Sequence, residues 1–152
     1  MYKRDELKVL KKEFWEGFSS FLSLIPELFH RKGRFLLYDT KISGVEMKFD
    51  LSRNGVMVVL VLNHSNLEKR ELIWEKIKSY RVVFEEQQFS KNLIWNEDYV
   101  RDCGSHVKRV YVQCEDLNFH RREDWAKMYR FMAEEMLKME TAFLEIRDVI
   151  AD

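Results

Sequence analysis

The chain has 152 residues, the length of one domain, and its mix of 46% hydrophobic and 34% charged residues is that of a folded protein rather than a disordered one. Its 26 basic and 26 acidic side chains balance, so no net charge draws it to nucleic acid or to acidic membranes. The longest apolar run, residues 56–62, is far too short for a membrane span, and the first residues contain no apolar signal segment. We expect one cytoplasmic domain over residues 1–152, with free thiols.

The first predicted element is an amphipathic helix over about residues 4–24. Its apolar residues recur at spacings of three and four, which places them on one face of a helix. They are Leu7, Leu10, Phe14, Phe18, Phe21 and Ile25. Pro26 ends the helix, because proline disfavours helical geometry in the residue before it.

Three strands are predicted after this helix. Residues 35–38 form a short apolar run, and residues 45–51 alternate apolar and charged side chains, which is typical of a strand with one buried face. Asn54-Gly55 is a strong hairpin signal, because both residues tolerate a positive φ. Residues 56–62 are apolar on both faces, which predicts a central strand of the sheet.

A second helix is predicted over residues 65–88, where Ser65 and a glutamate three residues later have the spacing of a capping box. Two further strands are expected at residues 93–95 and 106–114, since both segments are rich in β-branched and aromatic side chains. The polar residues 96–105 between them indicate a turn.

The last predicted element is a helix over about residues 121–150, which at 1.5 Å per residue would extend roughly 45 Å. It carries an apolar stripe of Trp125, Met128, Met132, Met136, Met139, Phe143, Ile146 and Ile150. Methionine suits both core packing and adaptable partner surfaces. Because the helix is longer than a domain of this size requires, we expect it to pack on the sheet and also to mediate a homodimer.

The order of these elements is helix, three strands, helix, two strands, helix, which predicts an α+β fold. Sequential hairpins favour a mostly antiparallel sheet of about five strands, packed with three helices. No linker, low-complexity segment or internal repeat divides the chain.

No common catalytic motif is present, whether nucleophile elbow, phosphate-binding loop or dinucleotide-binding glycine pattern. Cys103, His106, Cys114 and His120 are zinc-ligand types within eighteen residues. A strand over residues 106–114 would nevertheless hold its two ends roughly 25 Å apart, whereas zinc ligands must converge. We therefore expect no metal site and no cofactor, and we favour a non-enzymatic domain.

One alternative is a divalent-metal nuclease. Asp39 precedes Glu46 and Lys48 in an order that resembles the pattern of restriction-type nucleases, where two carboxylates hold the ion and a lysine helps to activate water. An amphipathic strand produces the same short pattern, so the solvated face of a strand is the competing interpretation.

A second alternative is an anion-binding site at His64 and Arg70. His64 lies where a strand ends and a helix begins, and helix N-termini attract anions. Arg70 follows one and a half turns into that helix, from where it could reach a bound carboxylate or phosphate.

A third alternative is a nucleic-acid patch. Arg31, Lys32 and Arg34 cluster in the loop after the first helix, and Lys108-Arg109 is another basic pair. If these residues converge, they could follow a phosphate backbone, with Trp95 or Tyr38 stacking on a base. The competing interpretation is ordinary surface charge, given the neutral total.

Several local patterns resemble a bacterial and archaeal family of domains of unknown function, whose members occur alone or C-terminal to a restriction-nuclease-like domain. The matching stretches are Glu13-Phe14-Trp15, the alternating strand before Asn54-Gly55, His64 with Arg70-Glu71-Leu72, Leu93-Ile94-Trp95 and Glu123-Asp124-Trp125. The resemblance implies an α+β domain and little about activity, since the family has no agreed catalytic residues to carry over. We therefore expect a binding or assembly domain that is dimeric, non-enzymatic and accessory to DNA-directed systems.

Overall fold

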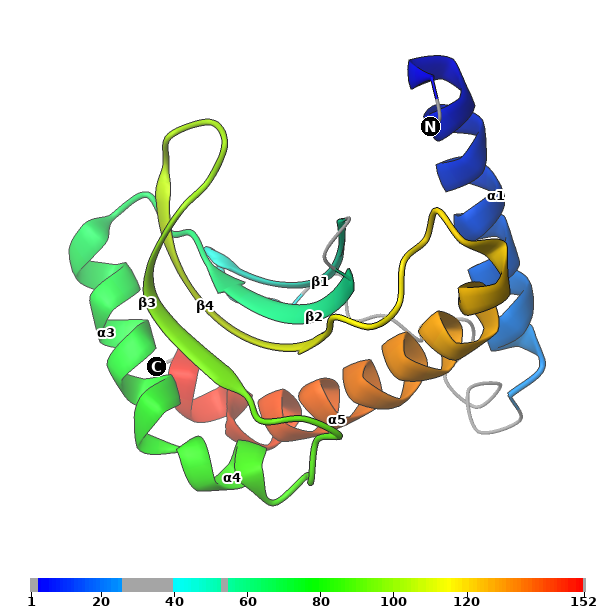
Figure 1. Cartoon of the computed structure of the whole chain (residues 1–152). Coiled ribbons are helices and arrows are strands. Elements are labelled where there is room, and N and C mark those ends of the chain that lie inside the picture. Colours follow the sequence, from blue (N-terminus) through cyan, green and yellow to red (C-terminus); the bar gives the residue numbers. More distant parts are fainter. Residues whose placement is uncertain (1–2, 26–39, 53–54, 152) are drawn as a thin grey trace.

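The computed structural model describes residues 3–25, 40–52 and 55–151, which fold as one antiparallel sheet with helices packed on it (Figure 1). In chain order the elements are α1 (Arg4–Ser23), β1 (Val45–Ser52), β2 (Gly55–Leu62), α3 (Leu67–Ser79), α4 (Arg81–Glu85), β3 (Ile94–Val100), β4 (His106–Cys114), a 3-10 turn (Arg122–Asp124) and α5 (Trp125–Ala151). The predicted α+β class and antiparallel sheet are confirmed. None of the helices in the described ranges combines the length and apolarity needed to span a membrane.

The sheet has four strands in the order β1-β2-β4-β3, and each neighbouring pair is antiparallel. Every residue of β2 is buried, so the prediction of a central strand apolar on both faces is confirmed. The β1–β2 hairpin closes at Gly55, whose φ of 118° favours glycine. A Cβ atom there would overlap the carbonyl oxygen of Cys114 on β4, so glycine also allows the backbones to approach.

The core lies between the sheet and α5, which runs beneath it (Figure 1). All four methionines of the α5 stripe are at most 1% exposed, so the stripe forms the chain's own core. Helix α1 packs against α5, where the Tyr129 hydroxyl donates to the Phe14 carbonyl at 2.7 Å. A Cβ atom at Gly17 would overlap that hydroxyl, so glycine permits the close approach. Burial raises the pKa of Tyr129 to about 12.

The single helix predicted over residues 65–88 is wrong, because the chain breaks at Tyr80 into α3 and α4. Tyr80 has φ −106° and ψ 25°, outside helical geometry. The break turns the chain so that Phe84, which is fully buried, packs edge-on against Trp95 with 5.7 Å between ring centroids. The helix start also differs, since Asn66 rather than Ser65 is the N-cap and accepts from the Lys69 N–H at 3.1 Å.

The predicted turn over residues 96–105 is wrong in its first half, because β3 continues to Val100. Its polar residues belong to an edge strand with a bulge between Asn96 and Tyr99, and exposed edge strands lack a clear apolar alternation. The described residues therefore hold four strands and four α-helices instead of about five strands and three helices. The strand predicted at residues 35–38 lies outside the described ranges.

Candidate binding site on the open face of the sheet

The two faces of the sheet have different surroundings. Helices α3, α4 and α5 lie on one side, and the opposite, concave side faces no described helix, between the β3–β4 hairpin and α1 (Figure 1). We call this second side the open face. Because side chains alternate along a strand, β4 sends Lys108 and Val110 towards the helices, and Val107, Arg109 and Tyr111 to the open face.

Arg109 is held between two aromatic rings on the open face. Its guanidinium carbon lies 3.5 Å from the ring centroid of Tyr99 on β3 and 4.6 Å from that of Tyr111 on β4. Its Nε atom is inaccessible to solvent and has no hydrogen-bond partner. The rings fix the plane of the guanidinium, which presents several donors in one rigid arrangement suited to an oxyanion.

A cavity of about 300 Å³ opens beside this guanidinium. Its floor is apolar, because Val59, Val61 and Val107 from the two central strands are at most 3% exposed. Five charged side chains surround the floor, namely Lys48, Asp50, Arg101, Asp102 and Arg109. None of the ion pairs among the described residues includes any of these five.

The β3–β4 turn forms one rim of the cavity. Arg101 donates from its backbone N–H to the Ser105 carbonyl at 2.9 Å and from Nε to the Ser105 hydroxyl at 2.8 Å. Gly104 adopts φ 89°, as this tight turn requires. Cys103 lies 3.1 Å from the Ser105 hydroxyl, and this hydrogen bond lowers the pKa of the Cys103 thiol. The rim is therefore a locally fixed structure.

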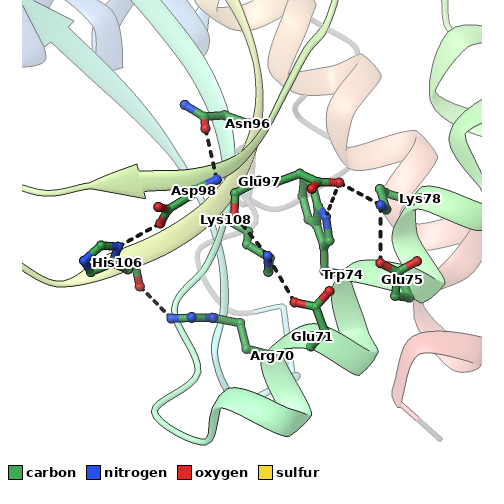
Figure 2. A network of polar contacts seen from close by, with 10 residues as sticks. All are labelled: Arg70, Glu71, Trp74, Glu75, Lys78, Asn96, Glu97, Asp98, His106 and Lys108. Atoms are coloured by element: carbon green, nitrogen blue, oxygen red, sulfur yellow. Dashed lines mark hydrogen bonds and ion pairs between the residues drawn. The ribbon is translucent and has the colours of Figure 1, made fainter.

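The helix-covered side of β3 and β4 carries a network in which Lys78 and Lys108 are paired with carboxylates (Figure 2). Lys108, with only 13% of its side chain exposed, bonds the Glu71 carboxylate at 3.1 Å and the Glu97 carbonyl at 3.0 Å. Lys78 contacts Glu97 at 2.7 Å and Glu75 at 3.3 Å. The hydrogen bond from Lys78 lowers the pKa of Glu97, and the same bond raises the pKa of Lys78.

The predicted anion-site residues have separate roles in the described part of the chain. Arg70 belongs to the network of Figure 2, where its Nη1 donates to the His106 carbonyl at 2.6 Å, and His106 in turn contacts Asp98 at 2.8 Å. His64 accepts a hydrogen bond from the Asn66 N–H at 2.9 Å through Nδ1. No hydrogen bond links His64 with Arg70, and anion binding by this pair stays a prediction.

The other predicted site residues lie partly outside the described ranges. Glu46 and Lys48 are exposed on the open side of β1, and Lys48 lines the cavity, whereas Asp39 is not described. The predicted nuclease trio therefore stays a prediction. The basic residues Arg31, Lys32 and Arg34 are also outside the described ranges. Within those ranges, no three His, Cys, Asp or Glu side chains are arranged to hold a metal ion.

Lys108 and Arg109, a basic pair in the sequence, point to opposite faces of the sheet, because side chains alternate along a strand. Trp95 is partly buried, 5.9 Å from Trp74 and with Arg81 over its ring, and its stacking on a base stays a prediction. Asp50, Tyr99, Arg101 and Asp102 were not predicted from the sequence as site residues. The alternation of apolar residues along β4 was the available signal, since it already separated Arg109 from the buried positions.

The protein is an α+β domain whose sheet has one helix-covered face and one open face. The chain belongs to a family described as a domain of unknown function, DUF4268, whose model matches residues 10–147. The expected membership of a domain family of unknown function is thereby confirmed. No curated protein and no solved structure matches the chain.

Proposed function

We propose that this chain is a non-enzymatic binding domain whose ligand or partner occupies the open face of the sheet. The observation that supports this proposal is the ring of five charged side chains that surrounds an apolar floor without forming ion pairs among described residues. Charged groups that contribute only to folding are normally paired where they are partly desolvated, as in the network of Figure 2. Unpaired charges around a cavity are typical of a site that a ligand completes.

The test is an NMR titration of ¹⁵N-labelled protein with defined probes: nucleoside monophosphates, oligothymidylate and a short DNA duplex, each with and without Mg²⁺. We expect shift changes confined to the open-face residues of the four strands, and unchanged probes after incubation. Cleavage of either DNA in the Mg²⁺ samples would contradict the non-enzymatic proposal. Shift changes confined to α3, or no change with any probe, would contradict the open face as the binding site.

We also keep the predicted homodimer through the C-terminal helix as a proposal, but with the interface restricted to the outer side of α5. Because the methionine stripe packs inside the chain's own core, a second copy would contact the outer side of α5, where Leu144 and Val149 are 41% and 42% exposed. Light scattering of the wild-type chain and of Leu144→Glu at tens of micromolar would test it. A wild-type monomer would overturn the dimer, and a dimer that survives the substitution would overturn this interface.

The resemblance to nuclease-associated domains supports a role as an accessory to DNA-directed systems. The oligothymidylate and duplex samples address this directly, since an accessory that contacts DNA itself should respond to one of them. A response that weakens with rising salt would support it, because release of counterions from phosphates makes such binding salt-dependent.

A further inference from the structure

The composition of the cavity restricts the ligand that it can hold. Three of its five charged side chains are cations and two are carboxylates, so the site has a net charge of +1. A long polyanion would bring several phosphates past Glu46, Asp50 and Asp102, all of which lie on or beside the open face. A compact ligand with one strongly charged group meets the cations without this repulsion.

Arg109 supplies the recognition geometry. Its guanidinium is fixed between Tyr99 and Tyr111 and therefore loses little freedom when it binds. Its Nε is inaccessible to solvent, so the donors that a ligand can reach are those on the two Nη atoms. A rigid guanidinium with free donors matches the oxygens of a phosphate or carboxylate in a paired arrangement.

The number of cations that line the cavity favours a phosphate over a carboxylate as the ligand's charged group. A phosphate monoester carries a charge between about −1.5 and −2 at neutral pH and gains from several cations, whereas a carboxylate needs one. Lys48, Arg101 and Arg109 converge on a single cavity of about 300 Å³, at the lower end of the size range of ligand sites. The two carboxylates can accept hydrogen bonds from hydroxyl or amino groups on the rest of the ligand.

We infer that this cavity binds a small organic phosphate monoester that carries hydroxyl or amino groups, with its phosphate against Arg109 and Lys48 and its donors towards Asp50 and Asp102. This inference rests on the proposed function, because it assigns a ligand class to the same open face. It assigns Arg109 as the residue that selects the phosphate, and Tyr99 and Tyr111 as the residues that orient Arg109.

The test is isothermal titration calorimetry with the four ribonucleoside 5′-monophosphates and glucose 6-phosphate, beside the parent nucleosides, glucose and malate. We expect at least one phosphate to bind, and its unphosphorylated parent and malate not to. Arg109→Lys keeps the charge but loses the planar donors, so we expect at least about tenfold weaker binding. Lys48→Ala, at an exposed position on β1, should weaken binding by a smaller factor.

Arg81→Lys is the matched control, because Arg81 also stacks on an aromatic ring, with its guanidinium carbon 4.8 Å from the Trp95 centroid, but lies outside this cavity. It should bind the phosphate as the wild type does. Affinity should also fall below the second phosphate pKa of about 6, where the dianion is lost.

Three results would overturn the inference: no binding of any phosphate at millimolar concentration, binding of malate as strong as that of the phosphate, or full binding by both Arg109→Lys and Lys48→Ala. Each of these results would overturn the phosphate assignment without overturning the proposal that the open face is a binding site. A probe that shifts open-face resonances independently of Arg109 would leave the open face as the binding site and remove only the phosphate assignment.

Discussion

Lys108 and Arg109 are neighbours in sequence, yet they belong to two regions with opposite character. Lys108 lies in the network between α3 and the β3–β4 pair, where its ammonium group contacts both a carboxylate and a carbonyl (Figure 2). Arg109 lies on the open face, held by two rings and joined to no described carboxylate. The first cation is paired within the fold, and the second has no carboxylate partner among the described residues.

Pairing with a carboxylate, rather than charge or position in sequence, separates these two neighbouring cations. A partly desolvated charge that keeps its partners stabilises the fold, because removing one partner leaves the other uncompensated. A charge that is desolvated without partners lowers stability, and proteins commonly keep such destabilising groups at functional sites. Substitutions on the helix-covered face should therefore lower the free energy of unfolding more than substitutions on the open face.

The largest expected effect comes from Lys108→Met. It removes the ion pair with Glu71 and the hydrogen bond to the Glu97 carbonyl, so we expect the free energy of unfolding to fall by about 1–3 kcal/mol. Urea-induced unfolding followed by circular dichroism measures this change.

Arg109→Met is its matched control on the adjacent residue. It loses the stacking on two tyrosines but also removes a buried donor without a partner, so we expect a change below about 1 kcal/mol in either direction. Equal destabilisation by the two substitutions would contradict the division into a structural and a binding face.

A smaller effect is expected from the pH dependence of the network. The hydrogen bond from Lys78 lowers the pKa of Glu97, so the folded state binds a proton there less readily than the unfolded state. This contribution to stability is present above the ordinary glutamate pKa of about 4.3 and is lost as pH falls through the lower folded value.

Glu97→Gln cannot make this contribution, so its melting temperature should lie below that of the wild type at pH 7, and the difference should shrink by pH 3. The raised pKa of Lys78 predicts the mirror effect, with stability lost as pH rises above the ordinary lysine range. Thermal unfolding at a series of pH values checks both. A difference between the two proteins that is the same at pH 3 and pH 7 would show that Glu97 does not act through its charge.

The smallest effect concerns the reactivity of Cys103 at the rim of the cavity. The hydrogen bond with Ser105 lowers the pKa of the Cys103 thiol, so Ser105→Ala should slow alkylation by iodoacetamide at pH 7. Buried Cys114 should react only after unfolding, which provides an internal control in the same mass spectrum. A bound organic phosphate should also slow the reaction of Cys103, and an unchanged rate under saturating ligand would place that ligand outside the cavity.

Much of the fold follows from local pattern. The alternation over residues 45–51 and the continuous apolar run 56–62 predicted β1 and β2, because the side-chain period of a strand and its burial are visible in sequence. The stripe of α5 was recognised for the same reason. The break at Tyr80 and the length of β3 were missed, because they depend on contacts with Trp95 and on pairing at a sheet edge.

The candidate site was predicted only in part. Lys48 was named only in the nuclease alternative, which stays a prediction, and it lines a cavity shared with Arg101, which is more than fifty positions later in the sequence. The turn that carries Arg101 and Asp102 had no motif of its own. Convergence of residues from four strands and a turn is a property of sheet order and register, and a single sequence does not display these.

By itself, the sequence determined that Lys108 and Arg109 point in opposite directions, because alternation along a strand is a local property of the backbone. It also determined which strand is buried on both faces. Only the tertiary structure decided which side of β4 the helices cover, since that depends on how the connections cross the sheet. That arrangement paired Lys108 with Glu71 on the helix-covered face and left Arg109 between two tyrosines on the open face.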